Sequence, residues 1–119
     1  MHALIIEDHP VLAMTIADEL RECGYGTADI ATGQSEAIRM ATERCPDVIT
    51  VDEGLDQGSG IDAIRQICRH IAIPVIFVTA NPSMIRAAVP DAIVLEKPFS
   101  HQGMCDAILD AVKVARVYA

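Results

Sequence analysis

Five short, mostly apolar segments are spaced along the whole chain, and they constrain its fold more than any other feature. They are residues 3–6, 27–31, 48–51, 74–78 and 92–95. Between them, apolar residues recur three to four positions apart, as on one face of a helix. This alternation predicts β-α-β units with right-handed crossovers, and a parallel sheet covered by helices on both faces. We therefore expect an α/β fold.

The helices of this fold are expected after Pro10 and over residues 35–44, 61–71, 81–90 and 100–117. Pro82 and Pro90 bracket the fourth of them, which leaves room for about two turns at most. We therefore predict that the fourth helix is shortened or irregular. The second segment, 27–31, mixes polar and apolar residues and is expected near a sheet edge.

Length and charge limit what such a chain can do. Its 119 residues predict a single domain, 1–119, with a core that must be aliphatic because only 3% of residues are aromatic. The net charge of −8 repels nucleic-acid phosphates, so direct nucleic-acid binding is not expected. No apolar stretch approaches the ~20 residues of a membrane span. With no signal peptide visible, a cytoplasmic protein is expected.

The cysteines and histidines give no sign of a metal framework. Cys23, Cys45, Cys68 and Cys105 are far apart and contain no Cys-x-x-Cys pair. In a reduced compartment they are expected to be small apolar fillers, not disulfide or zinc ligands. His2, His70 and His101 show no ligand spacing. His9 lies beside Asp8, where a ligand or base role is the alternative, but it is expected at the surface.

Polar residues follow four of the five apolar segments. Glu7 and Asp8 come after the first, Asp52 after the third, Thr79 after the fourth and Lys97 shortly after the fifth. The carboxyl ends of parallel strands meet at one edge of a sheet, where ligands of open α/β folds bind. We therefore expect these side chains to form one site, with Asp52 as the first candidate for a reacting group.

The chemistry of this set points to phosphate. Three carboxylates at one edge need a cation or protons to coexist, and an oxygen-only donor set suits Mg²⁺. Lys97 can neutralise a phosphoryl oxygen, and Thr79 can donate a hydrogen bond to the same group. Beside these groups, Asp52 can act as a nucleophile toward phosphorus and form an aspartyl phosphate.

Taken in order along the chain, these motifs resemble the CheY-like receiver domain of two-component response regulators over nearly the whole length. The matching residues are Glu7-Asp8, Asp52 with Leu55 and Gly60 in the following loop, Thr79-Ala80 and Lys97-Pro98-Phe99. The resemblance implies a flavodoxin-like fold of five β-α units with strand order 2-1-3-4-5.

The resemblance also implies roles for individual residues. Asp52 would accept a phosphoryl group from a histidine kinase or a phosphotransfer protein. Asp8, Asp52 and the backbone carbonyl of Gly54 would bind Mg²⁺, with Glu7 assisting mainly through a metal-bound water. Lys97 would contact the phosphoryl group, and Thr79 would move to bond it. Such a domain is not an enzyme beyond its own phosphorylation and slow dephosphorylation, and it switches an interaction with a downstream protein effector.

Two departures from the family pattern concern the signalling face. Val94 occupies the position of the usual aromatic switch residue, three residues before the lysine, and the stretch from Thr79 to Lys97 is short. Phe77-Val78-Thr79 is partly similar to the receiver subgroup with a Phe-Ala-Thr-Gly-type motif and a short fourth helix. The usual output mechanism is therefore not expected, whereas the phosphorylation chemistry is.

Several alternatives stay open. One is a phosphorylation-independent receiver-like interaction module, although a pure scaffold has no need of the full set of site residues. Another is a Mg²⁺-dependent phosphatase or Toprim-type enzyme, but those use an Asp-x-Asp pair, and Asp52 is followed by Glu53-Gly54. Glu53 and Asp56 are expected to be solvated loop acids. With the last helix running nearly to the end, a stand-alone receiver is expected, unless the chain is an excised domain.

Overall fold

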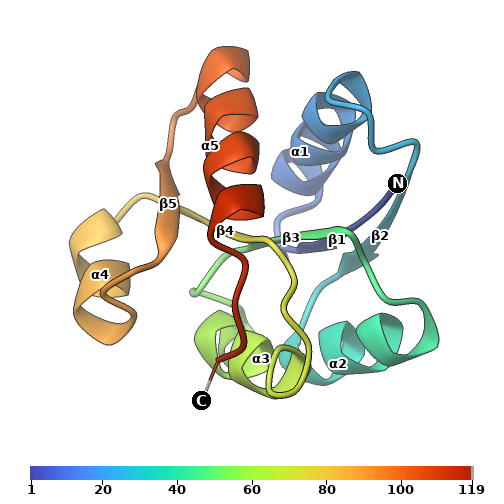
Figure 1. Ribbon diagram of the computed structural model, residues 1–119, viewed down its shortest axis with the longest axis vertical. Helices are drawn as coiled ribbons and strands as arrows, with labels where there is room; N and C mark the ends of the chain where they lie inside the picture. Colours follow the sequence, from blue (N-terminus) through green and yellow to red (C-terminus); the bar gives the residue numbers. More distant parts are fainter. Residues whose placement is uncertain (119) are drawn as a thin grey trace.

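A parallel sheet of five strands forms the centre of the molecule, as a computed structural model of the chain describes it for residues 1–118 (Figure 1). The strands are β1 (His2–Ile6), β2 (Thr27–Ala31), β3 (Val48–Val51), β4 (Val75–Thr79) and β5 (Ile93–Glu96). Their order is β2-β1-β3-β4-β5, and every neighbouring pair is parallel. The flavodoxin-like topology predicted above is thereby confirmed.

Five helices connect the strands and cover both faces of the sheet. They are α1 (Pro10–Glu22), α2 (Gln34–Glu43), α3 (Gly60–Ile67), α4 (Pro82–Ala88) and α5 (His101–Lys113). Helices α1 and α5 pack on one face, and α2, α3 and α4 on the other (Figure 1). No helix of the described part of the chain is long and apolar enough to cross a membrane.

The burial of the strands explains their positions in the sheet. All residues of β1, β3 and β4 are buried, because helices cover both of their faces. Strand β2 is exposed at its first two residues, is only partly buried over the next two, and lies at the sheet edge, as its mixed polarity predicted. Phe77 fills the α3 side of the core, and Ile16 and Leu20 fill the α1 side.

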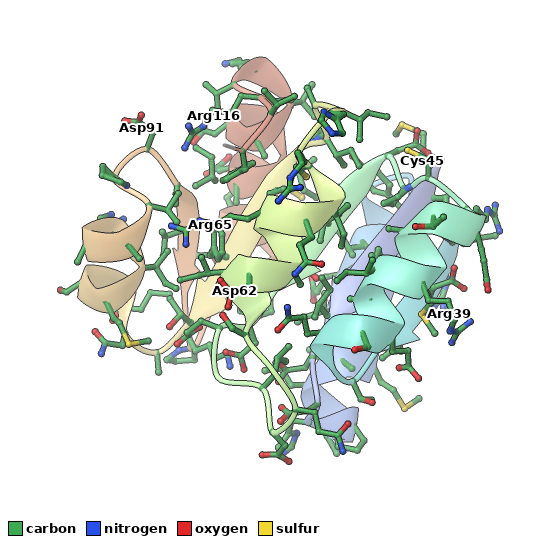
Figure 2. All side chains as sticks on the ribbon, turned by 90° about the horizontal axis from the view of Figure 1, so that it is seen from below. Arg39, Cys45, Asp62, Arg65, Asp91 and Arg116 are labelled. Atoms are coloured by element: carbon green, nitrogen blue, oxygen red, sulfur yellow. The ribbon has the colours of Figure 1, made fainter. Side chains whose placement is uncertain are left out.

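Helix α4 is short but regular. It spans seven residues, begins at Pro82 and is capped by the side chain of Asn81, which accepts from the backbone N–H of Met84 at 3.4 Å. Arg65 of α3 reaches across to donate to the carbonyl of Ala88 at the end of α4, at 3.5 Å (Figure 2). The predicted shortening is confirmed, and the helix is not irregular.

The ends of two other helices differ from the sequence-based expectation. Helix α3 ends at Ile67 and α5 at Lys113, short of the predicted residues 71 and 117. After α5 the chain crosses to the other face of the sheet, where Arg116 forms an antiparallel bridge with Ile73. Tyr118 then packs into the core beside α3.

Candidate functional site

The carboxyl edge of the sheet brings the predicted site residues together. One carboxylate oxygen from each of Glu7, Asp8 and Asp52 lies within 4.8 Å of the others. The Lys97 ammonium lies 3.1 Å from Asp52 Oδ2. Residues from several strand ends therefore meet at one point, as the parallel sheet predicted.

Backbone hydrogen bonds fix this alignment. The N–H of Asp52 donates to the carbonyl of Ile6 at 3.0 Å, which continues the β1–β3 pairing by one residue. The N–H of Lys97 donates to the carbonyl of Thr79 at 2.8 Å, which does the same for β4 and β5. The positions of these residues thus follow from strand register and not from flexible loops.

Asp52 is held as a carboxylate. Its Oδ1 accepts from the N–H of Gly54 at 3.1 Å, and its Oδ2 accepts from Lys97. Burial alone would raise its pKa, but the neighbouring Glu7 side chain, the Gly54 N–H, the Glu53 side chain and Lys97 together outweigh burial, so the pKa lies below its ordinary value. An ionised carboxylate is the form that can attack phosphorus.

Glu7 carries the proton instead. Its side chain is buried. Burial, as the larger cause, and the neighbouring Asp52 together raise its pKa to about 8. Asp8 is partly exposed, and its Oδ2 accepts from the N–H of Asp56 at 2.9 Å, so it also holds the loop after β3. Burial therefore holds Glu7 in place, and the hydrogen bond from Asp56 holds Asp8, before any cation binds.

Glu53 points into the site, and the expectation that it is a solvated loop acid is wrong. The buried hydroxyl of Thr79 donates to Glu53 Oε1 at 2.8 Å and accepts from the N–H of Asn81 at 2.9 Å. The other oxygen of Glu53 is buried without a hydrogen-bond partner. Burial raises the pKa of Glu53. Asp56 is exposed, as expected.

The loop between β3 and α3 is packed tightly against the site. Ser59 caps α3 by accepting from the N–H of Asp62 at 3.2 Å. A Cβ atom on Gly60 would lie 2.2 Å from the carbonyl oxygen of Asp52, so only glycine lets α3 begin this close to the strand end. This close approach is the physical reason for the Asp52 to Gly60 spacing noted in the sequence.

Two neighbouring residues have other surroundings. His9 is exposed and caps α1, its Nδ1 lying 3.4 Å from the N–H of Leu12. Val94 pairs with Phe77 and packs against the core on the α3 side. The aromatic switch position is therefore occupied by a small aliphatic side chain that is part of the core.

The donor set fits a hard cation. Glu7, Asp8 and Asp52 offer only oxygen atoms, which Mg²⁺ and Ca²⁺ prefer over nitrogen or sulfur. Burial raises the pKa of Glu7 most, and the nearby negative charge of Asp52 raises it further, which Lys97 only partly offsets. A divalent cation would remove this repulsion.

Comparisons with known proteins support the same interpretation. The profile of the "Response regulator receiver domain" family matches residues 3–109. PhyR, a phyllosphere-induced regulator of Methylorubrum extorquens, is 33% identical over 113 residues, covering 92% of this chain but only 42% of PhyR, so the chain spans less than half the length of that relative. The chemotaxis protein CheY of Thermotoga maritima is 31% identical, covering 88% of this chain and 92% of CheY.

Solved structures of receiver domains have the same fold as this chain. The receiver domain of Erythrobacter litoralis PhyR superimposes with a TM-score of 0.83 at 28% identity, covering 99% of this chain and 94% of that domain. The receiver domain of a Pseudomonas aeruginosa sensor histidine kinase, described with a magnesium ion in its active-site cleft, gives 0.81 at 25% identity, covering 95% and 98%. The chain belongs to the response regulator receiver domain family of two-component signalling.

Proposed function

We propose that this receiver domain is a phosphorylatable switch in which Asp52 is the phosphoacceptor. The observation that carries the proposal is the ionised, half-enclosed carboxylate of Asp52, in contact with Lys97 and flanked by Glu7 and Asp8. These residues follow three different strands. A purely structural role would not require this convergence of charge at one point of the sheet edge.

The phosphoryl donor is a histidine kinase or a phosphotransfer protein. An oxygen of Asp52 attacks phosphorus and forms a P–O bond, while the P–N bond of the donor phosphohistidine breaks and its electron pair stays on the imidazole nitrogen. Lys97 attracts a phosphoryl oxygen throughout. The product is an acyl phosphate on Asp52, and no redox change occurs.

Glu7, Asp8, Asp52 and the Gly54 carbonyl would hold Mg²⁺. When bound, the ion neutralises charge on the phosphoryl oxygens. Burial and the neighbouring Asp52 raise the pKa of Glu7, and a cation bound beside it would favour the ionised form, so Glu7 would release its proton as the cation arrives. Asp8 keeps the loop after β3 closed through its bond to Asp56.

Thr79 is the residue that would report phosphorylation. Its hydroxyl now donates to Glu53, and bonding the phosphoryl group requires it to change partner. Because Asn81 caps α4 and donates to Thr79, this change would reach α4 directly. We infer that the output passes through α4 and not through an inward-turning aromatic, because that position is Val94.

The downstream partner is a protein effector. A PhyR of Bartonella quintana, 33% identical over 94% of this chain and 46% of that protein, is described as an anti-anti-sigma factor, which supports a protein partner. The net charge of −8 argues against a nucleic acid as the direct partner. Cytoplasmic operation is part of this proposal.

The test is phosphorylation by acetyl phosphate with Mg²⁺, followed by intact mass measurement. Wild type should gain one phosphoryl group, and addition of EDTA beforehand should prevent the gain. Asp52→Asn should gain none, whereas Asp56→Asn, the same change at an exposed acid of the same loop, should behave as wild type. Absence of the gain in wild type would favour the phosphorylation-independent interaction module.

A further inference from the structure

A second cluster of metal-ligating side chains lies between α1 and α5. Cys23, at the end of α1, and Cys105 of α5 place their sulfur atoms 3.0 Å apart although they are 82 residues apart in sequence. His101, one turn before Cys105, places its Nε2 atom 3.4 Å from the Cys105 sulfur. The three donor atoms all lie within 4.8 Å of one another.

The orientation of His101 is fixed from its other side. Its Nδ1 atom contacts a carboxylate oxygen of Glu19, and Glu22 Oε2 lies 3.5 Å from the same nitrogen. Because a carboxylate only accepts hydrogen bonds, this contact places the proton on Nδ1. The Nε2 lone pair then faces the two thiols. Carboxylate–histidine pairing of this kind is typical of histidines that bind metals.

From this geometry, we propose that Cys23, His101 and Cys105 bind one thiophilic divalent cation, with Zn²⁺ as its representative. Two sulfur donors and one imidazole nitrogen suit Zn²⁺ and exclude Mg²⁺, which takes oxygen ligands. A solvent molecule would complete a tetrahedral site. A hollow of about 220 Å³, lined by Cys23, Cys105, Ile108 and Leu109, gives the cation access to the sulfur atoms.

A Cys23–Cys105 disulfide is the competing product of the same pair. The sulfur atoms are farther apart than the ~2.05 Å of a covalent bond, and both cysteines are free. A disulfide would make no use of His101, whereas the Glu19–His101 contact is the outer support that a metal-bound imidazole requires. We therefore favour the cation.

Cys23 and Cys105 would then not be the apolar fillers expected from the sequence. That interpretation remains for Cys68, which is buried and whose pKa burial raises to about 11. The spacing of His101 and Cys105, four residues apart on one helix face, was a visible signal. Cys23 could not be matched to them, because only the packing of α1 against α5 brings it there.

The consequence of binding would be a cross-link between α1 and α5. A cation bound only by the folded chain stabilises it by mass action, so the melting temperature should rise with metal concentration. The site uses no residue of the carboxylate cluster. Its occupancy should therefore be independent of Asp52 phosphorylation chemistry.

The experiment is a Co²⁺ titration of the untagged chain under a non-thiol reductant at mildly alkaline pH. With excess Mg²⁺ present to occupy the carboxylate cluster, wild type should bind one equivalent of Co²⁺ and show thiolate-to-cobalt charge-transfer absorption, which Zn²⁺ should abolish by displacement. Cys23→Ser and Cys105→Ser should lose the band. His101→Ala and Glu19→Gln should weaken binding roughly 10- to 100-fold, the usual effect of removing support from a metal ligand.

A matched variant tests whether the bound Co²⁺ lies at this cluster. Cys45→Ser changes a surface cysteine outside the cluster (Figure 2) and should show the wild-type charge-transfer band. Circular dichroism checks that every variant is folded. The proposal is overturned if folded wild type shows no charge-transfer band, or if the band survives in Cys23→Ser.

Discussion

Glu7 and Asp52 share one region of negative charge, but their pKa values are shifted in opposite directions. Burial and the neighbouring Asp52 raise the pKa of Glu7, while hydrogen bonds lower that of Asp52. The nucleophile is thereby ionised at neutral pH, while the buried acid beside it is neutral. This division keeps the cluster stable without a cation and leaves Glu7 ready to release its proton when one binds.

Glu7 should give the metal-free protein a distinctive pH dependence. Folded Glu7 keeps its proton up to about pH 8, whereas the unfolded side chain loses it near its ordinary value of 4.5. The folded state therefore binds more protons between these values, and the free energy of unfolding should fall as pH rises through this window. The lowered pKa of Asp52 acts only below its ordinary value of 3.8 and does not mask the effect.

Urea unfolding in EDTA across this pH range measures the effect. Glu7→Gln should flatten the dependence and stabilise the metal-free protein above neutral pH, since each pKa unit corresponds to about 1.4 kcal/mol. Glu53 keeps a smaller slope of the same sign, because burial raises its pKa too. Identical slopes in wild type and Glu7→Gln would show that Glu7 is ionised in the folded protein.

Glu53 should oppose activation, because it accepts the hydrogen bond of the Thr79 hydroxyl that a phosphoryl group would otherwise accept. In Glu53→Ala this competing bond and a nearby negative charge are gone. One hydrogen bond contributes about 0.5–1.5 kcal/mol, so beryllofluoride, a phosphoryl mimic, should bind roughly 2- to 10-fold more tightly. Calorimetric titration measures the affinity. Asp56→Ala removes an exposed acid of the same loop and is the control. An equal gain in beryllofluoride affinity in Asp56→Ala would show that the loss of negative charge, and not the loss of the hydrogen bond to Thr79, causes the gain.

The convergence of the predicted residues at one sheet edge could be foreseen from the sequence, but the Glu53 contact could not. Glu7, Asp8, Asp52, Thr79 and Lys97 stand at strand ends, and the parallel sheet dictates that such ends share one edge. Glu53 follows Asp52 in a loop, where no periodicity fixes the direction of a side chain. Only the position of Thr79 on the neighbouring strand gives its carboxylate a partner.

At the level of elements, the start of α3 and the end of β3 are mutually dependent. Gly60 lies against the carbonyl of Asp52, and Ser59 donates its N–H to Gln34 Oε1 at 2.9 Å, which ties the loop to the start of α2. Asp52 is thus supported by two helices. Movement of either helix would change the position of Asp52.

Gly60→Ala should therefore damage both stability and phosphorylation. The new Cβ atom would meet backbone atoms of Asp52, which cannot move without breaking the strand pairing. We expect a loss of about 1–3 kcal/mol in the free energy of unfolding, typical of overpacking, and slower phosphorylation by acetyl phosphate. Gly26→Ala adds the same methyl group where nothing lies within 4 Å and should be nearly neutral. Equal effects of the two substitutions would contradict this account.

Strands were better predicted than helix ends, for a physical reason. A buried strand is a short apolar run whose ends are marked by polar residues, as for β3 and β4. Apolar residues also continue beyond α3 and α5, where Ile71 and Val117 are exposed and others pack in the core. Ile73 and Tyr118 are buried outside any helix, in the segment where the chain end crosses the sheet edge. Periodicity alone cannot distinguish the two uses.

Across the whole molecule, the segment after α5 connects the two faces of the sheet. Helix α5 packs with α1, whereas Tyr118 packs in the core beside α3, and its N–H donates to the carbonyl of Cys68 at 2.8 Å. Figure 1 shows this segment running from the end of α5 to the side of α3. The segment after α5 thus closes the core at the edge opposite the carboxylate cluster.

Tyr118→Ala should lower global stability and leave the phosphorylation chemistry intact. The ring is 9% exposed and lies under the Arg116 guanidinium, 4.7 Å from its centroid, so truncation opens a cavity and removes a cation–π contact. We expect a loss of about 2–4 kcal/mol, since large-to-small core substitutions cost this much. Val117→Ala, at a residue 49% exposed, should stay within about 0.5 kcal/mol of wild type. Urea unfolding compares the variants, and acetyl phosphate labelling at low denaturant checks the site. If Tyr118→Ala unfolds at the wild-type urea midpoint, the segment after α5 does not contribute to the stability of the core. If the folded variant is not labelled by acetyl phosphate, the structure at this edge of the sheet affects the carboxylate cluster at the other edge.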